Sequence, residues 1–66
     1  MFEELNKEMA KQHIKPFSLA KQADINPSDL YSALHGQRPM FPNWRKRIAN
    51  ALDVPEEDIF PKEVEA

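Results

Sequence analysis

Residues 17–36 constrain the fold of this 66-residue chain more than any other segment, because their pattern is that of two short helices joined by a tight turn. Leu19, Ala20 and Ala23 share one face of the first helix. Asp24 is expected to end it, since Asp tolerates the left-handed backbone conformation better than most residues. A hairpin of two-turn helices is unstable alone, so the rest of the chain must supply helices that close its core.

The second helix of this segment has clear start and stop signals. Asn26 is a strong N-cap, Pro27 follows at the first helical position, and Asp29 adds a carboxylate to the first turn. Gly36, the single glycine of the chain, can supply the left-handed residue that ends the helix. The inward stripe consists of Leu30, Ala33 and Leu34, and the outward face of Ser28, Asp29, Tyr31, Ser32 and His35.

The remaining sequence predicts further helices and no strand. Few Thr or Val residues and a single Gly argue against β structure. The expected helices cover residues 2–13, 16–23, 27–35, 42–52 and a short segment that begins at 55. We therefore expect one all-α domain over residues 1–61, followed by a short acidic C-terminal tail over residues 62–66.

The composition excludes several classes of protein. The chain has no cysteine, which rules out disulfides and thiolate metal sites and fits a reducing compartment. No apolar run is long enough for a membrane span or a signal peptide, so we expect a cytoplasmic protein. His13 and His35 are far apart and lack carboxylates at ligand spacing, and no nucleophile neighbours a base. We expect no catalytic residue, no metal and no cofactor.

The charge is unevenly distributed along the chain. The formal net charge is −2, yet residues 10–50 contain seven Lys or Arg residues and only two acids. The other acids gather towards the two ends of the sequence. A basic middle can present a positive face to a polyanion in spite of the overall charge. The alternative is an ordinary solvated surface of mixed charge.

These features resemble the Cro and lambda-repressor-like helix-turn-helix family, also called the XRE family. The matching residues, spread over residues 14–60, are Leu19, Ala20, Ile25, Leu30, Ala33, His35, Gly36, Arg38, Pro39, Ile48, Ala49, Ala51, Leu52, Ile59 and Phe60. The resemblance implies a compact five-helix domain that binds double-stranded DNA, usually as a homodimer on a palindromic operator. Residues 27–35 would be its recognition helix. Asp24 departs from the usual Gly, and Pro16 from a frequent Gln that contacts phosphate.

The resemblance and the side-chain chemistry together predict two sets of DNA-contacting residues. The base-contacting set is Pro27, Ser28, Asp29, Tyr31, Ser32 and Arg38. Arg38 is the best candidate because Arg can pair with both O6 and N7 of guanine; it could instead hold a phosphate or a carboxylate. Asp29 could accept from cytosine N4 or act as a capping residue. The phosphate-contacting set is Lys15, Ser18, Lys21, His35, Asn43 and Lys46.

Apolar residues towards the C-terminus are candidates for self-association. They are Phe41, Trp44, Ile59, Phe60 and Val64. Aromatic residues are enriched at interfaces, although the same side chains could simply pack within the domain.

The leading functional hypothesis is a sequence-specific transcriptional regulator, of the small phage or mobile-element repressor type, that reads the major groove. The alternative is a protein-interaction module of the same fold, such as an antirepressor, antitoxin or adaptor, with a weakened DNA face. Pro16, Asp29 and the negative net charge favour that alternative.

Overall fold

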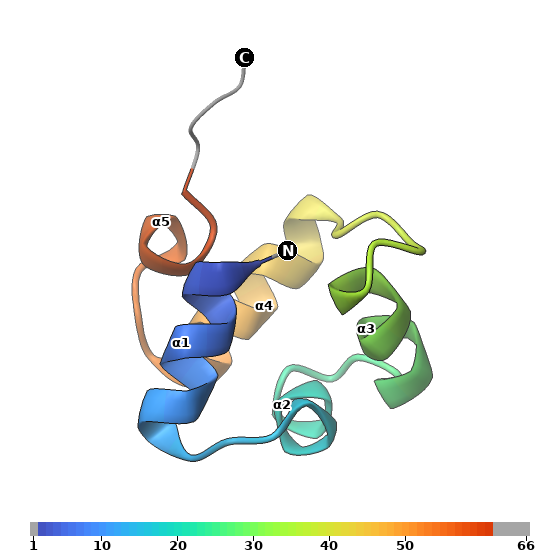
Figure 1. Ribbon diagram of the computed structural model, residues 1–66. Helices are drawn as coiled ribbons and strands as arrows, with labels where there is room; N and C mark the ends of the chain where they lie inside the picture. Colours follow the sequence, from blue (N-terminus) through green and yellow to red (C-terminus); the bar gives the residue numbers. More distant parts are fainter. Residues whose placement is uncertain (1, 62–66) are drawn as a thin grey trace.

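The computed structural model describes residues 2–61, and in this range it contains five α-helices and no strand (Figure 1). The helices are α1 (Glu3–Gln12), α2 (Pro16–Gln22), α3 (Pro27–Leu34), α4 (Pro42–Leu52) and α5 (Glu56–Ile59). The expectation of a compact all-α chain is confirmed. The expected tail, residues 62–66, lies outside the described residues. No helix within residues 2–61 has the length and apolar character needed to cross a membrane.

Local signals explain where the helices begin and end. Pro16, Pro27 and Pro42 each occupy the start of a helix, where the fixed φ of proline is already helical and its missing N–H is not needed. Asp24 and Gly36 follow α2 and α3 with φ of 59° and 78°. This left-handed backbone turns the chain away from the preceding helix.

Helices α1, α2 and α3 each end one residue earlier than the sequence predicted, and α1 and α5 each begin one residue later. His13 is the C-cap of α1 with a left-handed φ of 59°, and Phe2 flanks its start with a φ of 54°. His35 is the C-cap of α3 and not its last residue. A left-handed residue other than glycine has a weak sequence signature, so the end of α1 at His13 was not predicted. His35 has a φ of −96°, and the last turn of a helix has no sharp boundary in the sequence.

The helices surround one core that receives side chains from each of them. Its largest fully buried side chains are Leu5, Leu19, Leu30, Ile48, Leu52 and Ile59. Helices α1, α4 and α5 pack on one another, and α2 packs on α4. Helix α3 packs mainly on α2. Figure 1 shows α3 and α5 at opposite ends of the molecule. The α2–α3 pair therefore forms one end of the domain.

Two long-range hydrogen bonds to backbone carbonyls tie these helices together. The Gln12 side chain donates from Nε2 to the Leu52 carbonyl at 2.8 Å, which joins the last turns of α1 and α4. Arg47 of α4 donates from Nη1 to the Asp24 carbonyl at 3.1 Å. This second bond gives a donor to the carbonyl of a residue in the turn that follows α2. It also fixes the turn between α2 and α3 against α4.

Candidate nucleic-acid interface

Helix α3 divides cleanly into an inner and an outer side. Leu30 and Ala33 are fully buried against the core. Ser28 is exposed, and Tyr31 keeps 58% of its surface accessible. The remaining residues of the expected base-contacting set on this helix, Pro27, Asp29 and Ser32, are half-buried. The outer side of α3 is thus accessible to a ligand along its length.

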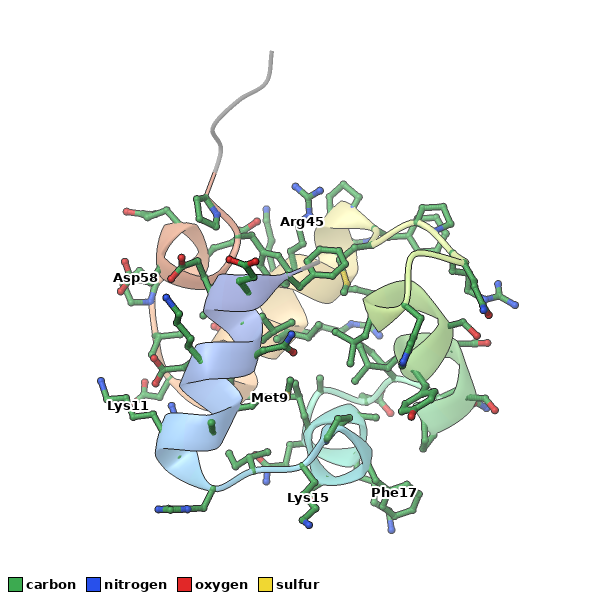
Figure 2. The ribbon with its side chains drawn as sticks, in the orientation of Figure 1. Met9, Lys11, Lys15, Phe17, Arg45 and Asp58 are labelled. Atoms are coloured by element: carbon green, nitrogen blue, oxygen red, sulfur yellow. The ribbon has the colours of Figure 1, made fainter. Side chains whose placement is uncertain are left out.

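The beginning of α2 and the outer side of α3 enclose an open groove, which we call the α2–α3 groove. Its lining residues are Lys15, Pro16, Phe17, Pro27, Ser28, Tyr31 and Ser32. Figure 2 shows Lys15 and Phe17 projecting away from the body of the molecule. The groove therefore brings four of the expected base-contacting residues together with Lys15 from the expected phosphate-contacting set.

Pro16 and Phe17 are the two residues of this groove that the sequence analysis did not assign to the site, and Phe17 is the more exposed of the two. Its side chain is 61% exposed, and Nζ of Lys21 lies 5.2 Å from the centroid of its ring. This is cation–π geometry, which limits the orientations of both side chains. The signal was available in the sequence, because Phe17 falls outside the helical stripe formed by Leu19, Ala20 and Ala23.

Asp29 and Arg38 form an ion pair at the start of α3. Nη2 of Arg38 lies 3.6 Å from Oδ1 of Asp29, and both side chains remain about half exposed. The N-cap of α3 is formed separately, because the Ser28 backbone N–H donates to Oδ1 of Asn26 at 2.9 Å. Of the partners considered for Arg38, the one observed is thus a carboxylate. The positive charge of Arg38 also reduces the repulsion between Asp29 and an anionic ligand.

His35 and Tyr31 interact at the other end of α3. Nδ1 of His35 lies 2.9 Å from the Tyr31 carbonyl, and the two ring centroids are 4.5 Å apart. A carbonyl oxygen only accepts, so the His35 nitrogen donates in this bond. His35 therefore caps a carbonyl of α3 and supports one side of the Tyr31 ring.

The other expected phosphate-contacting residues lie on two helices. Ser18 and Lys21 are exposed on α2 beside the α2–α3 groove residues of that helix. Asn43 and Lys46 are exposed on α4 and are not lining residues of the groove. The structure therefore collects Lys15, Ser18 and Lys21 on one helix or its cap, and it leaves Asn43 and Lys46 on a separate one.

The candidates for self-association separate into two groups. Ile59 and Phe60 are buried in the monomer core, which leaves their side chains little surface for a second chain. Phe41 is 43% exposed and Trp44 is half-buried, and their rings meet edge to face with centroids 4.9 Å apart. Val64 lies outside the described residues. Only the Phe41–Trp44 pair thus combines apolar character with access to solvent among the four described candidates.

The acidic ends of the sequence come together on another part of the surface. Glu3, Glu4, Glu56 and Glu57, in the first turns of α1 and α5, line one concave region together with Arg45. Carboxylates are stabilised there by the helix dipoles. Because α5 and α3 lie at opposite ends of the molecule (Figure 1), this acidic region is remote from the α2–α3 groove.

Within residues 2–61 the chain is a small all-helical protein in which Lys15 lines the α2–α3 groove and Lys21 lies against the ring of Phe17. Comparisons with protein-family models, with curated proteins and with solved structures found no match. Within residues 2–61, no group of three or more His, Cys, Asp or Glu side chains is placed to hold a metal ion. The chemistry of the α2–α3 groove is therefore the basis for assigning a function.

Proposed function

We propose that this chain is a sequence-specific regulator of transcription that binds double-stranded DNA through a lambda-repressor-like helix-turn-helix. Helix α3 enters the major groove, and α2 lies across the sugar-phosphate backbone with its first turn beside α3. The observation that carries this proposal is the outer side of α3, which is accessible while Leu30 and Ala33 anchor the helix in the core. An α-helix with its side chains is about 10–12 Å wide, and the major groove of B-DNA, about 12 Å wide, admits one helix.

The side chains around α3 supply the two kinds of contact that such binding requires. Ser28 and Ser32 are short polar residues that can bond base edges, and Arg38 can pair with guanine after leaving Asp29. Lys15 and Lys21 border the same surface and are suited to phosphates. Base contacts would determine sequence preference, whereas phosphate contacts would determine register and most of the affinity.

The proposal extends to the assembly and the setting of the protein. A homodimer would read a palindromic operator whose half-sites are about one helical turn apart. Phe41 and Trp44 are the described apolar residues best placed for pairing of two copies. A small phage or mobile-element repressor of the XRE type, acting in the cytoplasm, matches these properties.

A protein-interaction module of the same fold, such as an antirepressor, antitoxin or adaptor, is the second candidate. The Asp29–Arg38 pair favours this candidate, because Arg38 is the best candidate for a base contact and is bound to a carboxylate. The exposed rings of Phe17 and Tyr31 also favour it. In this case the α2–α3 groove would bind an apolar segment of a partner protein. Aromatic residues are common in such interfaces.

Selection from a random pool of duplex oligonucleotides tests the leading proposal. We expect a palindromic sequence to be enriched, and its spacing would report the symmetry of the complex. A binder that uses about 6–10 phosphates should lose roughly three to five decades of affinity between about 50 and 200 mM salt. Retention of no duplex in low salt would exclude DNA binding. Binding of a protein partner with little dependence on salt would favour the second candidate.

A further inference from the structure

Two of the three exposed aromatic side chains among residues 2–61 lie in the same groove. Phe17, Tyr31 and Phe41 are the large apolar residues with exposed side chains among residues 2–61. Phe17 and Tyr31 line the same α2–α3 groove, together with the apolar rings of Pro16 and Pro27. Single exposed apolar residues are ordinary, but a cluster in a concave site marks a binding surface.

Phe17 is also held in a defined position at the start of α2. It follows Pro16, which occupies the first helical position, and Lys21 lies one turn further along the helix. The ammonium group of Lys21 is 5.2 Å from the centroid of the Phe17 ring. The ring therefore lies beside a cation that can reach a phosphate, and an apolar contact and an ionic contact are available side by side.

The charges around this apolar cluster indicate a polyanion as its ligand. Lys15 lines the groove, Lys21 borders it, and Arg38 compensates the carboxylate of Asp29. Most of the acidic residues lie elsewhere, including the region at the starts of α1 and α5. An apolar ring framed by cations complements a nucleic-acid groove better than it complements an uncharged or basic partner.

The chemistry of the major groove then selects one group as the partner of Phe17. Base edges there present hydrogen-bond donors and acceptors, apart from the C5-methyl group of thymine. A phenyl ring that covered a donor or acceptor would remove its water without replacing the hydrogen bond. We propose that Phe17 contacts a thymine C5-methyl group in each half-site and thereby determines base preference from α2. This inference rests on the proposed DNA-binding function.

Uracil substitution tests this contact because it removes the methyl group and leaves the pairing edge unchanged. In the duplex selected by the full chain, each thymine is replaced by uracil in turn. We expect one position per half-site at which the affinity falls about fourfold, the value expected for one buried methyl group. For the Phe17→Ala variant, the thymine and uracil duplexes should bind equally well. Phe17→Leu should retain the preference through its apolar side chain.

Two further variants serve as controls. Phe41→Ala removes an exposed phenyl ring outside the α2–α3 groove. This variant should therefore still show the penalty for uracil, which is the loss of affinity when thymine is replaced by uracil. Tyr31→Ala removes the second exposed ring inside the groove. Circular dichroism establishes that each variant is folded. If Phe17→Ala does not fold, the comparison uses Phe17→Gln, which keeps the length of the side chain and a good helix propensity. A penalty lost in Phe17→Gln and kept in Phe17→Leu would then support the contact.

The outcomes separate this inference from the function on which it rests. A penalty for uracil that persists in Phe17→Ala overturns the inference, and its loss in Tyr31→Ala alone would assign the methyl contact to Tyr31. A specific duplex that binds with equal affinity in its thymine and uracil forms overturns the inference and leaves DNA binding intact. If the unaltered chain retains no duplex, both proposals are wrong.

Discussion

Nη2 of Arg38 lies 3.6 Å from Oδ1 of Asp29, so the loop that follows α3 folds back onto the first turn of that helix. The pair holds the guanidinium near the outer side of α3 before any ligand arrives. Ion pairs between half-exposed side chains contribute only about 0–1 kcal/mol. A base or phosphate of the proposed operator can therefore displace the Asp29 carboxylate at little cost.

Replacement of Arg38 tests its proposed role as a base-reading residue. Arg38→Ala should weaken operator binding by about 1–3 kcal/mol and relax the preference at one base pair. Arg38→Lys preserves the charge but cannot pair with guanine in the same planar manner, so it should lose specificity more than affinity. Titrations against the selected duplex and its single-base variants measure both effects. Equal weakening for all duplexes would reduce Arg38 to a phosphate contact.

Neutralisation of Asp29 should have the opposite effect on affinity. Asp29→Asn removes a negative charge from a surface that faces phosphates, and we expect tighter binding to all duplexes, by up to about fivefold. The same change should lower the free energy of unfolding by about 0.3–1 kcal/mol, because a carboxylate stabilises the first turn of a helix.

Asp58→Asn is the matched control for Asp29→Asn. Asp58 lies in the first turn of α5, at the other end of the molecule (Figures 1 and 2). This variant should lose a similar amount of stability, measured by denaturant unfolding, without a change in DNA affinity. Weaker DNA binding by Asp29→Asn would contradict the expected repulsion and indicate that the carboxylate positions Arg38 productively.

Lys15 is expected to act through phosphate alone. Lys15→Ala should lower affinity about equally for all sequences and flatten the plot of log affinity against log salt concentration by about one unit. Lys11→Ala provides a control, since Lys11 is exposed on α1 and does not line the α2–α3 groove. Identical salt slopes for the two variants would remove Lys15 from the set of phosphate contacts.

The turn between α2 and α3 offers a test of stability that is independent of DNA. Asp24 has a φ of 59°, a conformation that glycine adopts without steric cost. Asp24→Gly should raise the free energy of unfolding by about 0.5–1 kcal/mol. The bond from Arg47 is retained because it goes to the backbone carbonyl. Asp24→Ala, measured in the same denaturant titration, should give no such gain.

Much of the fold could be predicted because its boundaries depend on local chemistry. Pro16, Pro27 and Pro42 start helices, and Gly36 follows one, as their fixed or permissive φ values require. The bond between Arg47 and the Asp24 carbonyl could not be predicted in this way. It joins residues on different helices, and a local pattern does not specify which distant groups meet.

The candidate site was predictable in part for the same reason. Helical periodicity identifies the outward positions of α3, because Leu30 and Ala33 mark its inner side. Periodicity cannot distinguish an apolar residue in the core from one at an interface, so the sequence left both alternatives open for Ile59 and Phe60, which the structure buries. The Asp29–Arg38 pair depends on the path of a loop, which composition does not determine.

The division of α3 into a buried side and an accessible side has a consequence for engineering. Leu30 and Ala33 anchor the helix, whereas Ser28 and Tyr31 are exposed. Ser28 and Tyr31 can therefore be exchanged with changes in the free energy of unfolding of about 0.5 kcal/mol or less. If the proposed function holds, a library randomised at these two positions would yield variants that bind new operator sequences.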